Sequence, residues 1–320
     1  MTDIFTLGEA LIDFVPTESG LPLSEVPGFR RRFGGAPANV AMGLAKLGSD
    51  AGFIGKVGED SFGDFLTQEL FEAGVNIDQL YKTDRANTTL AFVSLTKEGD
   101  RDFAFYRNPG ADELLQPEEI DAATLGEAKV FHFGSISFTQ PESLRATKKA
   151  VAISQDENLK VTMDPNIRLN LWEEPSKLKS LVESLLGKVD LIKLSEEEVY
   201  FLTDTEDLKT GITNLSARGP KTVVVTLGAR GCLLYRNGRI KRLDGYQVEV
   251  KDTTGAGDGF MAGLLHNLLK NTDKLSNLQT TNLLEAAKFG NATGALTTTD
   301  YGATSAFPDP TDVDKFLEER

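Results

Sequence analysis

The sequence contains too few cysteines and histidines for two common kinds of site. Cys232 is the one cysteine among 320 residues, so the chain cannot form a disulfide within itself. It lies in an apolar strand-like run, Gly231 to Tyr235, which favours a buried, unreactive thiol. The two histidines, His132 and His266, lie in an apolar strand pattern and a helical pattern. We therefore interpret both as structural residues rather than metal ligands.

Excess positive charge and long apolar runs are also missing. The chain has 34 Lys and Arg against 48 Asp and Glu, a formal net charge of −14. Nucleic-acid surfaces are basic, so this composition argues against such a partner. No apolar stretch is long enough to span a bilayer, and the start, Met1 to Asp3, lacks the pattern of a signal peptide. We expect a cytoplasmic protein with no membrane partner.

One glycine-rich stretch, Asp252 to Phe260, carries the strongest chemical signal. It follows a β-branched run, Gln247 to Val250, and precedes a helical pattern with an apolar face at Phe260, Leu264, Leu265, Leu268 and Leu269. A turn that opens a helix presents unpaired N–H groups and the positive end of the helix dipole. The stretch therefore predicts a site for a phosphate or a developing oxyanion.

Asp258 lies where such a site would hold an anion. A carboxylate there repels the anion unless it has a task, and accepting a proton from a substrate hydroxyl is that task. The alternative is an ordinary glycine turn in which Asp258 caps the helix. The chain has no GxxxxGK[ST] motif, and Phe260 occupies the third glycine position of GxGxxG. Neither a Walker A loop nor a dinucleotide fingerprint is therefore present.

The rest of the chain alternates between short apolar strands and amphipathic helices. We predict strands at 4–7, 51–57, 130–133, 160–164, 191–194, 222–226 and 232–235. We predict helices near 40–47, 62–71, 141–156, 175–187, 196–203, 206–218, 260–269 and 283–296. This alternation indicates an α/β fold with a mainly parallel sheet that is covered on both faces.

Hairpin-like segments interrupt the alternation. Two strands, 88–95 and 102–107, flank the turn Lys97 to Asp100, and residues 14–33 are polar and rich in turn formers. We predict one domain over 1–320 with a small β-sheet lid formed from about 14–33 and 88–109. The exposed edge of such a lid favours a homodimer.

Polar residues gather where the predicted strands end. Asp13 follows the first strand, and Gly34, Gly35 and Asn39 stand at the start of a helix, where bare amides and a carboxamide suit a polyhydroxylated ligand. Further polar clusters occupy 134–137, 164–168, 194–198 and 226–231. Each cluster alone is explained by loops and caps. Together they predict a ligand crevice at the carboxyl edge of the sheet.

Two signatures in this order resemble those of the PfkB/ribokinase family of carbohydrate kinases. They are FGGAPANVA at 33–41 and DTTGAGDGF at 252–260. The strings GEALIDF, FYRNPGAD, HFGSIS, DPNIRLNLW and KLSEEE extend the resemblance over nearly the whole chain, most closely to the fructokinases. The resemblance implies a ribokinase-like three-layer α/β/α fold with a β-sheet lid. It also implies ATP and a small sugar as ligands, and Mg²⁺ as cofactor, joined in some members by K⁺.

The resemblance implies roles for individual residues. Asp258 would act as the catalytic base. The anion hole would be formed by Gly255, Ala256 and Gly257, and Arg168 would lie near the transferring phosphoryl group. Sugar-contacting positions match Asp13, Gly34, Gly35, Asn39 and Arg107. ATP-binding positions match Lys193, Ser195, Thr226, Gly228, Gly231 and Asn291. Metal positions match Glu198, acting indirectly on Mg²⁺, and Asp252 and Thr254 for K⁺.

The chain departs from the family pattern at two positions. Ser195 stands where many relatives have the asparagine of an NxxE motif, whereas Glu198 keeps the glutamate. We expect an altered organisation of the metal rather than lost activity. Ala306 stands at a side-chain ligand position for K⁺, which leaves K⁺ activation open.

Other functions compete with fructokinase. A 2-keto-3-deoxygluconate kinase shares much of the pattern, with Arg107 and Arg168 available to an acidic sugar. Ribokinase and aminoimidazole riboside kinase match less well. A non-catalytic sugar or nucleotide sensor would not need Asp258, and a dinucleotide-dependent oxidoreductase would need the missing fingerprint.

Overall fold

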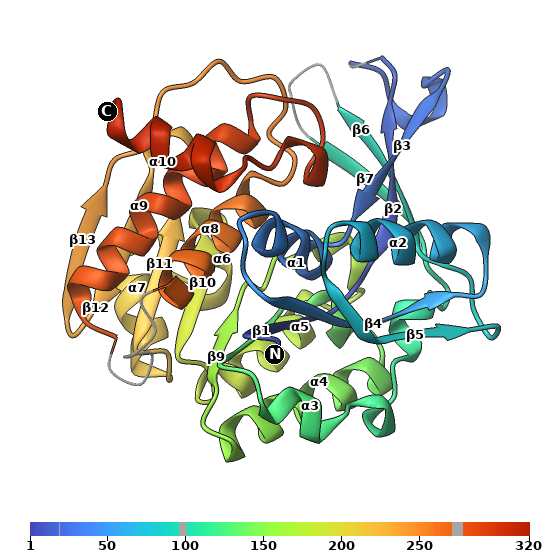
Figure 1. The fold of residues 1–320 in the computed structure, drawn as a ribbon, viewed down its shortest axis with the longest axis horizontal. Coiled ribbons are helices and arrows are strands. Elements are labelled where there is room, and N and C mark those ends of the chain that lie inside the picture. The colour runs from blue at the N-terminus through green and yellow to red at the C-terminus, as the bar shows by residue number, and fades with distance from the viewer. Residues whose placement is uncertain (19, 96–100, 271–277) are drawn as a thin grey trace.

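The computed structural model describes residues 1–18, 20–95, 101–270 and 278–320. Its central feature is a nine-stranded sheet with the order β13-β12-β11-β10-β9-β8-β1-β4-β5 (Figure 1). The strands are β1 (Ile4–Leu7), β4 (Ala51–Gly58), β5 (Asn76–Thr83), β8 (Val130–Phe133), β9 (Lys160–Met163), β10 (Leu191–Ser195), β11 (Thr222–Thr226), β12 (Cys232–Arg236) and β13 (Arg239–Leu243). Neighbouring strands are parallel except where β12 pairs with β11 and β13. The predicted mainly parallel α/β sheet is confirmed.

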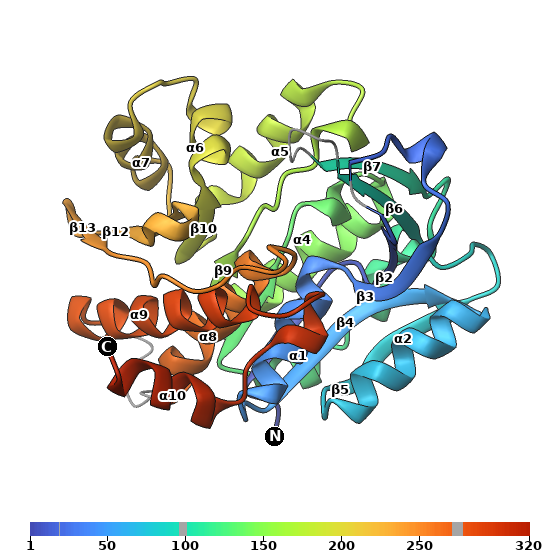
Figure 2. The same cartoon turned by 90° about the horizontal axis from the view of Figure 1, so that it is seen from above.

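Helices cover both faces of this sheet (Figure 2). They are α1 (Ala36–Lys46), α2 (Ser61–Glu72), α3 (Ala122–Gly126), α4 (Pro141–Asp156), α5 (Pro175–Leu186), α6 (Glu196–Thr203), α7 (Leu208–Ala217), α8 (Ala256–Lys270), α9 (Thr280–Thr297) and α10 (Pro310–Glu318). Side chains alternate along β1, so Phe5 packs in the cluster formed with α4 to α7, whereas Ile4 packs with α1, α8, α9 and α10. This gives the three layers that the sequence predicts.

A separate four-stranded sheet stands beside the central one, with the order β3-β2-β6-β7. Its strands are β2 (Leu11–Pro16), β3 (Phe29–Gly34), β6 (Leu90–Leu95) and β7 (Arg101–Tyr106). Both segments predicted for the lid contribute to it, and the predicted turn at 97–100 lies outside the described residues. Asp13 lies within β2, paired with Arg32 of β3 and Ala91 of β6. It therefore belongs to the small sheet and not to the carboxyl end of a central strand.

Some elements differ from the predictions. Three elements, β5, β13 and α10, were not predicted. The strand β13 has the charged sequence RIKRL and lies at the edge of the sheet, so it lacks the apolar pattern by which the other strands were predicted. The β-branched run at 247–250 joins no sheet, and Val250 is 55% exposed. Among the described residues, no helix has the length and apolarity that crossing a bilayer requires.

Candidate active site

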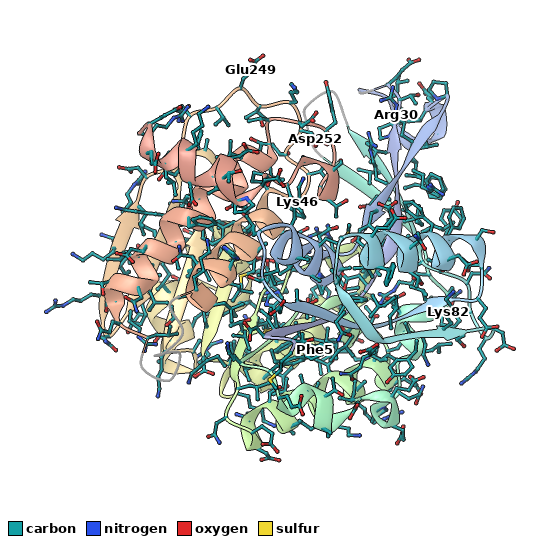
Figure 3. The ribbon with its side chains drawn as sticks, in the orientation of Figure 1. Phe5, Arg30, Lys46, Lys82, Glu249 and Asp252 are labelled. Carbon is teal, nitrogen blue, oxygen red and sulfur yellow. The ribbon has the colours of Figure 1, made fainter. Side chains whose placement is uncertain are left out.

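A cavity of about 560 Å³ separates the small sheet from the start of α8. Its walls come from β2 and β3, from the N-terminus of α1, from the loop before α8 and from the loop after α9. Figure 3 labels Arg30 on β3 and Asp252 on the loop before α8, which both line it. The predicted residues in its wall are Asp13, Gly35, Asn39, Arg168, Asp252, Thr254, Gly255 and Asp258.

Asp258 lies in the first turn of α8 and faces Asn39 of α1. The Asn39 side-chain amide donates a hydrogen bond of 2.8 Å to Oδ2 of Asp258. Burial raises the pKa of Asp258 to about 6, while the Asn39 hydrogen bond opposes that rise. A carboxylate with this pKa is ionised at neutral pH and still basic enough to take a proton from a hydroxyl.

The glycines before Asp258 allow the backbone to turn closely against its neighbours. Gly255 has φ of 75°, and a Cβ on it would lie 2.5 Å from Cβ of Ala303. A Cβ on Gly257 would lie 3.0 Å from Nζ of Lys193. Because α8 begins at Ala256, its first N–H groups have no partner within the helix, although the Ala256 N–H donates to the carbonyl of Thr253 at 3.3 Å.

A buried ion pair lies beneath this turn. Nζ of Lys193 donates to Oδ2 of Asp164 over 2.7 Å, and the side chains are 9% and 4% exposed. Burial opposes the charge of Lys193, but its pKa remains raised because Asp164, Glu198 and Asp258 surround it with negative charge. The pair therefore places one cation among the carboxylates of Asp164, Glu198 and Asp258.

A second cavity, of about 270 Å³, shares Asn166 and Arg168 with the first. Lys193, Ser195 and Glu198 also line it. Arg168 thus stands between the cavity that contains Asp258 and the cavity that contains Glu198.

Ser195 and Glu198 form a reciprocal cap on α6. Oγ of Ser195 accepts from the Glu198 N–H at 3.2 Å, and Oε2 of Glu198 accepts from the Ser195 N–H at 2.7 Å. The other oxygen of Glu198 accepts from the Ile167 N–H at 2.7 Å. Burial and the charge of Asp164 raise the pKa of Glu198. Serine at this position therefore has a structural use in helix capping.

The remaining predicted nucleotide residues gather beyond β11. A Cβ on Gly231 would clash with the backbone at Asp244, whose carbonyl accepts from Asn291 at 3.3 Å. Thr226 ends β11, and Gly228 opens the turn to Gly231 with φ of 58°. Among the described residues, these four positions line neither of the two cavities. Cys232 is buried beneath them, and burial raises its pKa to about 12, as expected of an inert thiol.

Asp252 organises the loops around the start of α8. Its Oδ1 accepts from the N–H and the hydroxyl of Thr254, at 2.9 and 2.7 Å. Its Oδ2 accepts from the Gly302 N–H at 3.0 Å. The carboxylate therefore ties the loop before α8 to the loop after α9. Ala306, nearby in sequence, is buried and offers no side-chain oxygen.

Two predicted sugar residues lie behind the cavity wall. Gly34 leaves room for Asp13, because a Cβ there would lie 2.3 Å from Oδ2 of Asp13. The Arg107 side chain is 2% exposed and forms ion pairs with Asp112 and Glu113. Burial opposes its charge, yet its pKa is raised by these two carboxylates. Its guanidinium is thus committed to a buried cluster.

Sequence reasoning assigned no role to several residues of the site. Glu9 is 2% exposed, and its Oε1 accepts from the Ala36 N–H at 2.9 Å at the start of α1. Burial raises the pKa of Glu9 to about 7. Its place just after a strand was the signal that could have identified it. Arg30 and Arg32 also line the cavity, and their alternation along one strand puts both on the same face.

Known proteins match the chain over its whole length. The sequence profile of the pfkB family carbohydrate kinases matches residues 1–310. Probable fructokinase-6, chloroplastic, from Arabidopsis thaliana is 44% identical over 307 residues, which cover 95% of this chain and 79% of that protein.

Solved structures agree with the sequence match. A double mutant of fructokinase from Vibrio cholerae O395, with fructose, ADP and potassium ion bound, has a TM-score of 0.89 and 34% identity, covering 99% of this chain and 98% of that one. Fructokinase with bound ATP from Xylella fastidiosa has a TM-score of 0.90 and 33% identity, covering 100% and 99%. Together with the Asp258 site and the three-layer fold, these matches establish that the chain belongs to the pfkB family of carbohydrate kinases.

Proposed function

We propose that the protein is an ATP-dependent fructokinase, which transfers the γ-phosphoryl group of ATP to the 6-hydroxyl of D-fructose. The contact between Asn39 and Asp258 carries this proposal, because it aims a weakly basic carboxylate into a cavity that also contains Asp13 and Gly35. Hydroxyl-rich ligands need such converging polar groups. The fructokinases to which the chain is similar support fructose as the acceptor.

Asp258 takes the proton from the attacking hydroxyl as the new O–P bond forms. The N–H groups at residues 255–257 and the guanidinium of Arg168 stabilise the negative charge that gathers on the transferred group. Lys193 contributes positive charge from below the turn. ADP leaves with the electron pair of the broken O–P bond. Positioning and charge stabilisation thus provide most of the catalysis.

The residues fit a magnesium ion that is held mainly by the nucleotide. Among the described residues no group of three acidic, histidine or cysteine side chains forms a metal cage. Oδ1 of Asp164 is buried without a hydrogen-bond partner, and Glu198 lines the same small cavity. We propose that these two carboxylates would hold Mg²⁺ indirectly, and that the ion would neutralise phosphate charge.

Activation by K⁺ is proposed with a limited set of ligands. Both oxygens of Asp252 already accept hydrogen bonds, and Ala306 supplies no side-chain oxygen. A K⁺ ion beside Thr254 would therefore depend largely on main-chain carbonyl groups. Turnover compared in KCl and in NaCl of equal ionic strength tests this, and equal rates would remove K⁺ from the proposal.

We further propose that residues 1–320 act as one domain whose small sheet serves as a lid. Leu11, Val15, Val93 and Phe105 of this sheet line the cavity, so its closure would exclude water from the phosphoryl group. We also propose a homodimer through the exposed edges of the lid and a cytoplasmic location. Light scattering tests the first and cell fractionation the second.

One observation favours a second acceptor, 2-keto-3-deoxygluconate. Arg30, Arg32 and Lys251 line the cavity and would attract the carboxylate of an acidic sugar. Arg107 is committed elsewhere, so these residues replace it in that hypothesis. A non-catalytic sensor remains the alternative of another class.

ADP release with ATP and Mg²⁺ against a sugar panel tests these proposals. The panel holds D-fructose, 2-keto-3-deoxygluconate, ribose, glucose and aminoimidazole riboside. Turnover on fructose alone supports the fructokinase. Preference for the keto acid overturns the choice of acceptor and keeps the mechanism. Sugar binding without ADP release supports the sensor.

A further inference from the structure

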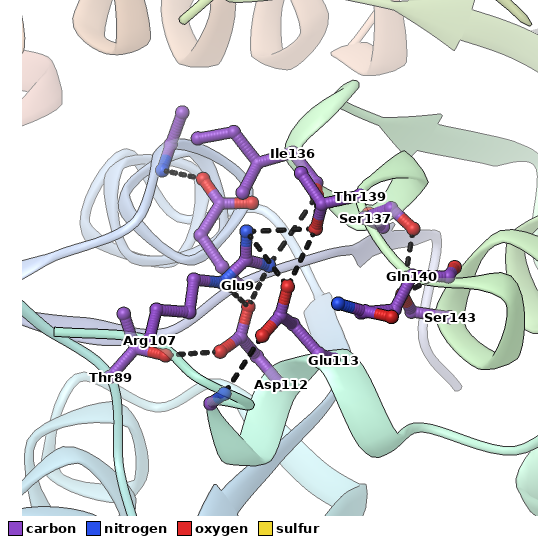
Figure 4. Close-up of polar contacts among 12 residues, drawn as sticks. Glu9, Thr89, Arg107, Asp112, Glu113, Ile136, Ser137, Thr139, Gln140 and Ser143 are labelled. Atoms are coloured by element: carbon purple, nitrogen blue, oxygen red, sulfur yellow. Dashed lines mark hydrogen bonds and ion pairs between the residues drawn. The ribbon is translucent and has the colours of Figure 1, made fainter. Parts of the chain in front are cut away.

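One carboxylate holds both ends of the β6–β7 hairpin (Figure 4). Thr89 immediately precedes β6, and its hydroxyl donates to Oδ1 of Asp112 at 2.5 Å. Arg107 immediately follows β7, and its Nε and Nη2 donate to Oδ2 of Asp112 at 3.1 and 2.5 Å. Each oxygen of Asp112 therefore binds a different root of the hairpin.

The same cluster is fastened to the main body of the fold. Arg107 also donates to the hydroxyl of Thr139 at 2.9 Å, in the segment that follows β8. Thr139 in turn donates to Oε1 of Glu113 at 2.9 Å. The Ala111 N–H donates to the carbonyl of Asn87 at 2.9 Å, which joins the segment of Asp112 to the chain before the hairpin.

Water is largely excluded from these contacts. Asp112 is 6% exposed and Glu113 is 3% exposed, and the Arg107 side chain is 2% exposed. Hydrogen bonds to a charged group are stronger and more directional in such surroundings. The cluster can therefore hold a fixed geometry, unlike an ion pair at the surface.

The hairpin that it holds forms part of the cavity wall. Val93 of β6 and Phe105 of β7 both line the cavity. The carbonyl of Thr89 also accepts from the Ile12 N–H at 3.0 Å, next to the predicted sugar ligand Asp13. A shift of the hairpin roots would thus move both the apolar wall and β2.

We propose that Asp112 is a positioning residue that clamps both roots of the β6–β7 hairpin over the sugar cavity. Arg107 acts through this clamp and not by touching the sugar. The kinetic part of the proposal rests on the proposed sugar-kinase function. The structural part does not, because the clamp exists whatever the acceptor is.

The test compares a variant that breaks the contact at one root with a variant of Asp112 itself. Thr89→Val removes one hydroxyl with little change in shape, and Asp112→Asn removes the charge that pairs with Arg107. Thr89→Ser retains the hydroxyl. Thr147→Val is the matched control, because Thr147 is also fully buried and donates to the carbonyl of Ser143 within α4.

Hydrogen exchange at residues 90–95 and 101–106 reports the hairpin without any need for activity. We expect faster exchange there in Thr89→Val and Asp112→Asn, and wild-type exchange in Thr89→Ser and Thr147→Val. Unchanged exchange in the first two variants overturns the clamp. Because hydrogen exchange does not depend on turnover, a wild-type protein without kinase activity would overturn the proposed function but not the clamp.

Steady-state kinetics then separate positioning from a general loss of stability. We expect KM for D-fructose to rise about tenfold in Thr89→Val and Asp112→Asn, the effect of losing a hydrogen bond to a charged group. KM for ATP should stay at its wild-type value, and the double variant should resemble the worse single variant. If Arg107→Lys abolishes sugar binding while Thr89→Val leaves it intact, Arg107 touches the sugar directly and the proposal fails.

Discussion

Asn39 donates a hydrogen bond of 2.8 Å to Asp258, although 219 residues separate them in the chain. The contact joins the N-terminal turn of α1 to the N-terminal turn of α8. Asn39 is 5% exposed, and the partly buried bond lies in the wall of the cavity. It orients the carboxylate and favours its ionised form.

Asp258→Asn should lower kcat by about 10²- to 10⁴-fold, because an amide cannot accept the proton. The substitution keeps the size of the side chain, so ATP should bind as in the wild type. ADP release and calorimetric ATP binding check the two halves of this prediction. Turnover near the wild-type rate would remove Asp258 from the role of base.

The wild-type kcat should rise with pH through about pH 6 and then level off. The pKa of Asp258 is raised to about 6 by burial, and only the ionised form accepts a proton. Asn39→Ala removes a hydrogen bond that lowers this pKa, so the acidic limb should move to higher pH. Profiles of kcat at saturating sugar and ATP measure the shift, and coincident limbs would contradict it.

Gly255→Ala should lower kcat, whereas Gly238→Ala should not. Both glycines have φ of 75°, so alanine brings the same backbone strain, about 1 kcal/mol. The new Cβ meets open space at Gly238 but lies 2.5 Å from Ala303 at Gly255. Unfolding curves and kcat for the pair separate strain from displacement of the anion hole. Equal kcat values would show that the turn tolerates displacement.

Lys193→Met should destabilise the fold by about 3–5 kcal/mol, because Asp164 would remain buried without its partner. The exposed pair of Lys82 with Asp64 provides the control, and Lys82→Met should cost less than about 1 kcal/mol. Denaturant titrations measure both. The Lys193→Met variant should also raise the pKa of Asp258, since the charge of Lys193 lowers that pKa.

Local signals predicted some helices well. The strand–helix boundary at Ser195 follows from a reciprocal cap with Glu198, and α6 has the predicted bounds of 196–203. Pro141 starts α4, which spans the predicted 141–156. The Gly-rich turn and Asp258 were likewise visible, because their chemistry lies in one continuous stretch.

Contacts between distant segments were not visible in the same way. No local pattern distinguishes an Arg107 that reaches a ligand from one that turns back to Asp112. Asp13 was expected at the end of a central strand. Its actual pairing with Arg32 and Ala91 could not be predicted, because it depends on how two later strands assemble. The burial of Glu9 between α1 and the cavity depends on packing in the same manner.

The division of the cavity between the two ends of the chain affects how the protein is made. Residues 9–39 contribute one wall, and residues 251–302 contribute the carboxylate and the turn. A ribosome must therefore synthesise nearly the entire polypeptide before any centre able to consume ATP exists. A nascent chain that stalls before α8 lacks Asp258 and therefore cannot complete this cavity.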